Sequence, residues 1–209
     1  MSTAAVQKQA RNVAEVSPDF VIHLGPFSHK FTDQDFEKAC QQNPDLRIEM
    51  SKEGQLIIMM PAVYDGSNRN FKLTGRFAAW VESNDLGEGF DSSNCFTLPN
   101  GAKRGPDAAW IRKERADALT PEQRNTFANI CPDFVIELRS KTDRLKPLQN
   151  KMSEYIENGA QLGWLIDPSQ GKVHIYRPDR PIEILEQPAE ISGEDVLPGF
   201  VLQLAGILD

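Results

Sequence analysis

The segment PDAAWI at residues 106–111 is followed by PDFVIELRS at residues 132–140 and by LGWLIDP at residues 162–168. Each segment contains a nearly continuous apolar run of strand length. Such runs are typical of strands that are buried on both faces of a sheet covered by helices. A stretch with helical periodicity, residues 148–158, lies between the second and third runs. The pattern therefore predicts an α/β fold in which the three runs form the centre of one sheet.

Two acidic residues lie beside or inside these runs, Asp107 before the first and Glu137 within the second. Burial of an unpaired carboxylate is costly, so each residue needs a cation or a hydrogen-bond donor nearby. Two carboxylates on neighbouring strands can hold a hard divalent ion such as Mg²⁺, which prefers oxygen ligands and keeps several waters. Taken singly, each residue has a structural alternative: an Asx turn after Pro106 for Asp107, and an ion pair with an arginine for Glu137.

The composition is that of a globular protein with one sizeable core. For the 209 residues we expect a flexible leader at residues 1–19 and a single domain at residues 20–209. The longest apolar run, residues 56–63, is too short to span a membrane, and no signal peptide is visible. The three cysteines are isolated in the sequence, which argues against a zinc site and favours a reducing, cytoplasmic location.

Charge is segregated along the chain. The net charge of −7 argues against a nucleic-acid partner, because phosphate binding requires cations. Residues 139–151, however, contain five basic residues and one acidic residue, whereas residues 182–196 contain five acidic residues and no basic one. The basic segment directly follows Glu137 and weakens the objection to a nucleic-acid partner. An ordinary solvated loop is the alternative.

Five pieces of the sequence carry a resemblance to a known family: residues 56–61, 101–110, 132–140, 151–155 and 163–168. With Pro-Asp before one strand, Glu on the next and a lysine after it, the chain resembles the PD-(D/E)xK nuclease superfamily. More narrowly, residues 43–177 are similar to a large bacterial family of putative restriction endonucleases. The resemblance implies a restriction endonuclease-like core, with a central mixed β-sheet flanked by helices, and metal-dependent hydrolysis of DNA phosphodiester bonds.

The resemblance also assigns roles around the two carboxylates. Asp107 and Glu137 would bind Mg²⁺ or Mn²⁺, with the backbone carbonyl of Leu138 as a further ligand. The ion would lower the pKa of its bound water and stabilise charge on the scissile phosphate. The sequence departs from the superfamily pattern two residues after Glu137, where Arg139 replaces the lysine. Arginine stays charged and cannot act as a base, although it can hold a phosphate.

Lys151 is the candidate that replaces the missing lysine. The helical periodicity places Lys151 at one edge of an apolar stripe and Gln149 at the other, whereas Glu154 is expected to face solvent. The resembling family also has a lysine at this place, so we expect Lys151 to position the attacking water. A lysine that lies along the helix flank is the alternative. We expect Arg139, Lys141 and Gln149 to contact the nucleic acid.

The surrounding elements are predicted from shorter patterns. We expect a helix from about residue 68 to residue 82, after a turn at residues 65–67, and a single strand over residues 90–98. Superfamily members often carry an acidic residue on the first core helix. Only Glu82, near the far end of the expected helix, is available, and it is given no role.

The predicted function is that of a metal-dependent endonuclease acting on DNA. The main alternative is a non-catalytic DNA-binding or protein-interaction module on the same scaffold, and hydrolysis of a smaller phosphoester is a third possibility. No separate recognition domain is visible beside the core. Because cleavage of two strands usually needs two sites, we also expect a homodimer.

Overall fold

The three apolar runs become three adjacent strands in the middle of a six-stranded sheet in the computed structural model, which describes residues 31–209. The strands are β6 (Ala108–Arg112), β7 (Phe134–Leu138) and β8 (Leu162–Asp167). β7 and β8 run parallel because α5 (Leu145–Glu157) connects them, whereas β6 and β7 are antiparallel. The prediction of a mixed central sheet is thereby confirmed. The leader predicted at residues 1–19 lies outside the described residues.

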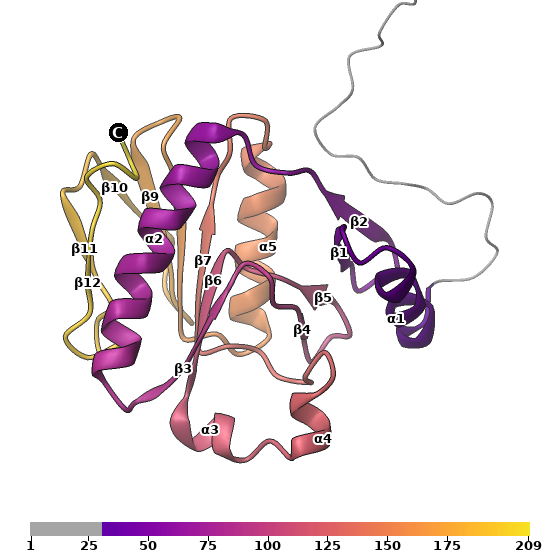
Figure 1. The fold of residues 1–209 in the computed structure, drawn as a ribbon. Coiled ribbons are helices and arrows are strands. Elements are labelled where there is room, and N and C mark those ends of the chain that lie inside the picture. Colours follow the sequence, from indigo (N-terminus) through magenta and orange to yellow (C-terminus); the bar gives the residue numbers. More distant parts are fainter. Residues whose placement is uncertain (1–30) are drawn as a thin grey trace, which may run out of the picture.

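Three antiparallel strands extend this sheet, which has the order β10-β9-β8-β7-β6-β3. They are β3 (Gly87–Asp91), β9 (Lys172–Tyr176) and β10 (Glu183–Glu186). Figure 1 shows α2 (Tyr64–Ser83) and α5 on either side of the central strands. A hairpin of β11 (Glu190–Ser192) and β12 (Val201–Gln203) packs beside α2. No helix in residues 31–209 is both long and apolar enough to cross a membrane.

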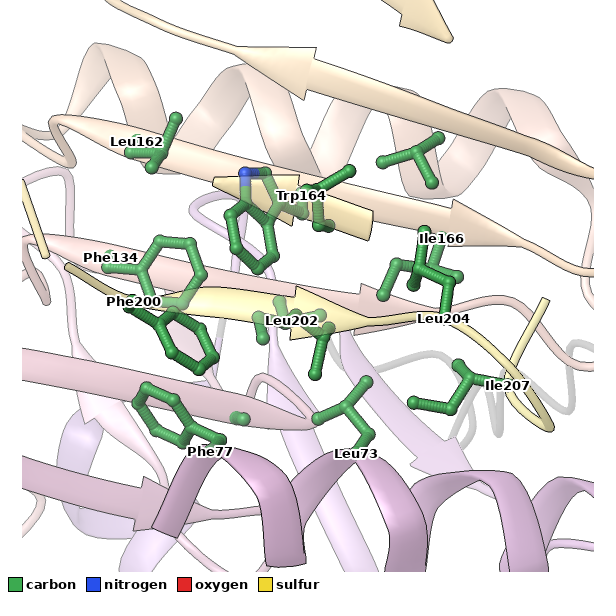
Figure 2. Close-up of a cluster of buried hydrophobic side chains, with 14 of the residues drawn as sticks. Leu73, Phe77, Phe134, Leu162, Trp164, Ile166, Phe200, Leu202, Leu204 and Ile207 are labelled. Carbon is green, nitrogen blue, oxygen red and sulfur yellow. The ribbon is translucent and has the colours of Figure 1, made fainter. Parts of the chain in front are cut away.

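Alternate residues of the central strands enter two different cores, because successive side chains of a strand point to opposite faces. On the face of α2, Trp164 packs edge to face on Phe134 with ring centroids 4.7 Å apart, and it stacks on Phe200 at 5.8 Å. Figure 2 shows how Phe77 of α2 and the C-terminal segment complete this cluster. On the face of α5, Leu165 belongs to the second cluster.

A smaller four-stranded sheet, of order β2-β1-β5-β4, lies beside the main one and packs against α1 (Asp33–Gln42). Its strands are β1 (Arg47–Met50), β2 (Leu56–Met59), β4 (Phe96–Thr97) and β5 (Lys103–Arg104). Two short helices, α3 (Lys113–Asp117) and α4 (Pro121–Arg124), follow β6. The α1–β1–β2 unit projects from the main body in Figure 1. Residues of β1 and β2 form one side of the cleft described below.

The structure corrects two element predictions. The single strand expected over residues 90–98 is wrong: β3 and β4 belong to different sheets. The side chain of Asp91 accepts hydrogen bonds from the backbone and hydroxyl of Ser93, and this local turn redirects the chain. α2 begins at Tyr64, four residues before the predicted start, so residues 65–67 form its first turn. Asp65 stabilises this turn because its negative charge lies near the positive, N-terminal end of the helix dipole.

His174 on β9 is a buried polar side chain with an unusual environment. It is 3% exposed, and neither ring nitrogen has a hydrogen-bond partner among the described residues. Leu165 is its neighbour across the β8–β9 pair. Burial lowers the pKa of His174, and the nearby carboxylate of Asp167 opposes this effect. The imidazole is therefore held neutral at a cost in stability.

We expect His174→Leu to raise the free energy of unfolding by about 1 kcal/mol at pH 8, because it removes two unsatisfied polar atoms. The gain should grow as the pH falls below about 6.5, where the unfolded histidine binds a proton that the folded one resists. Urea unfolding at pH 8 and pH 5.5 measures both effects. A parent protein that is more stable than the variant at both pH values would contradict the prediction.

Candidate active site

Asp107, directly before β6, lies opposite Glu137 of the adjacent strand β7. The pairing of Ala108 with Ile136 places Asp107 across from Glu137 in the antiparallel register, and opposed residues have side chains on the same face. The backbone N–H of Leu138 donates to Asp107 Oδ2 at 2.8 Å, which orients the carboxylate. Both residues line one open cleft of about 1010 Å³. The structure thus brings the two predicted carboxylates together.

Lys151 reaches the same place from α5. Its Nζ lies 2.8 Å from Glu137 Oε1 and 2.7 Å from Glu49 Oε1, and it donates to the carbonyl of Gly105 at 3.3 Å. Burial lowers the pKa of Lys151, but the carboxylates of Glu137 and Glu49 outweigh this effect and raise the pKa above its ordinary value. Lys151 is therefore a fixed cation, which suits it to positioning and charge stabilisation rather than to proton abstraction.

The carboxylates around Lys151 differ in their proton affinity. Burial raises the pKa of Glu137 to about 7, and Asp107 and Glu49 add to the effect while Lys151 opposes it. The Tyr155 hydroxyl donates to Glu137 Oε1 at 3.2 Å. Burial also raises the pKa of Asp107. For Glu49 burial is outweighed by Lys151 and Arg104, so its pKa is lowered. Burial is thus the main cause that disfavours the charged forms of Asp107 and Glu137, and a bound cation would favour those charged forms.

Asp107 and Glu137 fit the needs of Mg²⁺ or Mn²⁺. These ions accept one or two carboxylates and fill the remaining positions with water and substrate oxygens. Within residues 31–209, no three His, Cys, Asp or Glu side chains form a complete metal site. An open cleft with two oxygen donors on one face suits an ion that keeps much of its water.

Glu49 on β1 is a residue of this cluster that the sequence analysis missed. Its Oε1 accepts from Lys151 and from the backbone N–H of Gly105 at 3.0 Å, and its Oε2 lies 3.2 Å from Arg104. One signal was present in the sequence: Arg47 and Glu49 alternate with two apolar residues that enter the core beneath α1. Arg47 lies 3.8 Å from Asp107, so this charged face of β1 points at the site.

The acidic residue that the first core helix contributes to the cleft is Asp65, in the first turn of α2, which lies 3.6 Å from Lys141. Glu82 of α2 lines a different hollow, beside β3, and does not line the cleft that holds Asp107. The buried acidic residue nearest to Lys151, apart from Glu137, is instead Glu49 of the small sheet.

Glu154 is not directed into solvent, so that expectation is wrong. Its carboxylate accepts from Arg104 Nε at 2.6 Å and from the side-chain amide of Asn100 at 3.0 Å, and its side chain is 12% exposed. The small sheet covers this side of α5, which a helical wheel of α5 alone cannot reveal. Arg104 thereby links Glu154 to Glu49 and holds the small sheet against the helix.

The residues expected to contact nucleic acid separate into two groups. Arg139 and Lys141 line the cleft, and Gln149 does not. Arg139 is fixed by Asp167, whose Oδ2 lies 2.7 Å from its Nη1, so its guanidinium is preorganised at the end of β7. Lys141 is 70% exposed and lies 3.6 Å from Asp65. Gln149 is in α5, two residues before Lys151, and is absent from the lining of the cleft.

Comparison with known proteins gives a family and a fold. A model of the Uma2 family, described as "Putative restriction endonuclease", matches residues 33–205. The crystal structure of a putative nuclease belonging to DUF820 from Anabaena variabilis is similar, with a TM-score of 0.65 and 20% sequence identity over 77% of this chain and 89% of that chain. No curated protein matches the chain. Because the family model spans most of the sequence and the fold agrees with that of the similar structure, the chain belongs to the Uma2 family of putative restriction endonucleases, and its mixed sheet flanked by helices is a restriction endonuclease-like fold.

Proposed function

We propose that the protein is a metal-dependent nuclease that hydrolyses phosphodiester bonds in DNA. The observation that carries the proposal is the meeting of Asp107, Glu137 and Lys151 in one open cleft, with Lys151 Nζ 2.8 Å from Glu137. Two carboxylates with a fixed cation beside them are suited to phosphoryl transfer, where charge on the phosphate must be neutralised. Membership of the Uma2 family supports the same reaction class.

The residues of the cleft have different roles in the proposed reaction. Asp107 and Glu137 would hold Mg²⁺ or Mn²⁺, which when bound supplies a water of lowered pKa and stabilises charge on the scissile phosphate. Lys151, held by Glu49 and Glu137, orients the attacking water and offsets the developing charge. Arg139 takes a neighbouring phosphate, for which its fixed guanidinium provides paired donors.

The proposal is tested by incubating the purified protein with supercoiled plasmid, linear duplex and single-stranded DNA. Each substrate is combined with Mg²⁺, with Mn²⁺ or with EDTA. We expect strand cleavage with either ion and none with EDTA, and we expect the activity to elute with the protein in size-exclusion chromatography. Failure to cleave any of the three substrates with either ion would contradict the proposal.

The specific rival is a binding module without catalysis. It is favoured by one observation: the Lys151 ammonium bridges Glu49 and Glu137 and so competes with a metal ion for Glu137. DNA binding in EDTA without cleavage in Mn²⁺ would support this rival. The homodimer expected from the need to cut two strands is also a proposal, and light scattering at micromolar protein concentration tests it.

A further inference from the structure

One side of the cleft is apolar. It consists of residues 57–63, which include most of β2 and the segment that joins β2 to α2. Met60 is 64% exposed and Val63 is 60% exposed. β2 is an end strand of its sheet, so this wall lies at a margin of the fold. A contiguous exposed apolar surface in a cleft is typical of a binding surface.

A second part of the lining is basic and comes from the segment between β7 and α5. Arg139, Lys141 and Arg144 belong to it. Acidic and basic side chains are nearly equal in number in the whole lining, and Arg139 and Lys141 already have carboxylate partners. The attraction for phosphates is therefore moderate, and phosphate contacts alone would bind a regular duplex only weakly.

The combination of an apolar wall and a moderately basic wall is better suited to an unpaired strand than to a regular duplex. A regular duplex keeps its bases stacked inside and presents phosphates and sugars, so an apolar wall gains little from it. An unpaired strand exposes its base faces, and proteins that bind such strands combine a basic track for the backbone with aromatic side chains on which the bases stack. Residues 57–63 instead offer the base faces an aliphatic surface, which gains from burial of apolar area.

We infer that the cleft takes a polynucleotide with unpaired bases, either a single strand or an unpaired segment within a duplex. The bases contact Ile57 and residues 59–63, whereas Ile58 packs against the small core, and the phosphates contact Arg139 and Lys141. This inference rests on the proposed function and narrows its substrate from DNA in general to strands whose bases are unstacked. The same chemistry would admit single-stranded RNA, and the test below includes it.

The test measures binding in EDTA, where no cleavage occurs, by fluorescence anisotropy. The probes are a fluorescein-labelled DNA strand of about 24 nucleotides, long enough for a typical binding site, the RNA of the same sequence, the fully paired duplex, and a duplex with an unpaired internal loop. We expect the single strand and the looped duplex to bind at least about tenfold more tightly than the paired duplex. The RNA arm shows which polynucleotide is preferred.

The matched variants are Met60→Ser/Val63→Ser in the wall and Phe71→Ser as the control. Phe71 is 77% exposed on α2 and does not line the cleft, so its replacement makes a comparable change in exposed apolar surface elsewhere. We expect the wall variant to lose on the order of tenfold in affinity for the single strand, and the control to lose none. All three side chains are exposed, so the fold should tolerate their replacement.

Other results would overturn the inference. If the parent and the wall variant bind paired and unpaired DNA with equal affinity, the inference is wrong, but the proposed nuclease function is not contradicted. A parent dimer that the wall variant converts to a monomer, with unchanged affinity for the single strand, would show that a second copy covers the wall. Absence of binding to every probe would contradict both the inference and the proposed function.

Discussion

Replacing Lys151 by methionine is expected to reduce cleavage by about a hundredfold or more and to destabilise the protein in the absence of metal. The first effect follows from the loss of the fixed cation beside the scissile phosphate. The second follows from burial: the Lys151 ammonium lies within 2.8 Å of both Glu49 and Glu137, and its removal leaves buried carboxylates without a counter-charge. Removing one partner of a buried ion pair lowers the free energy of unfolding by about 3 kcal/mol or more.

Mn²⁺ should separate these two effects. Because a divalent ion held by Asp107 and Glu137 supplies positive charge to Glu137, one of the two carboxylates that Lys151 contacts, we expect it to restore more stability to Lys151→Met than it adds to the parent, while cleavage stays low. Urea unfolding with EDTA and with Mn²⁺, together with a cleavage assay, provides the measurements. Lys113→Met is the control, since Lys113 pairs with Asp85 outside the cleft and should affect neither stability nor cleavage measurably. Parental cleavage by Lys151→Met would refute the role given to the lysine.

The second large effect is expected for Asp107→Asn, which should lower cleavage by about a thousandfold and greatly weaken Mn²⁺ binding. Asparagine keeps the size of the side chain and an oxygen that can accept from the Leu138 N–H, so the turn before β6 is preserved. It removes the negative charge that a divalent ion requires. Because burial already disfavours the charged form of Asp107, whose pKa is raised, we expect the loss of stability to be small.

Isothermal titration with Mn²⁺ measures the binding directly, so the test does not depend on a known substrate. Asp143→Asn is the matched control. Asp143 lines the same cleft and accepts a backbone N–H, from Ser140 at 2.8 Å, but it has no place in the proposed metal site. We expect this variant to bind Mn²⁺ like the parent. If Asp107→Asn binds Mn²⁺ normally and Asp143→Asn does not, the metal site has been assigned to the wrong carboxylate.

Local patterns in the sequence were sufficient for the central sheet. The three apolar runs are long enough to be strands and lack the alternation of a half-exposed sheet, and all three are buried on both faces in β6, β7 and β8. The same local reasoning failed at residues 90–98, where a turn at Asp91 sends one apolar stretch into two sheets. A short turn made by side-chain hydrogen bonds leaves little trace in hydrophobic periodicity.

The candidate site was predictable to the extent that it depends on adjacent strands. Asp107 and Glu137 are found together because β6 pairs with β7, and Lys151 joins them because α5 packs on the same face of the sheet. Gln149, by contrast, does not line the cleft. The helical periodicity of α5 gives both edges of its apolar stripe equal access to the sheet, and only the neighbouring elements decide which edge borders the cleft.

The sequence by itself determined the central strands and placed Asp107 directly before one of them and Glu137 within the next. Only the tertiary structure decided the partners of the buried charges: Glu49 for Lys151, Arg104 for Glu154 and Asp167 for Arg139. The physical reason is that a strand or helix is specified by the spacing of its own residues, whereas the partner of a buried charge depends on which distant segment packs over it. Glu49 and Lys151 lie 102 residues apart in the chain, and no local pattern connects them.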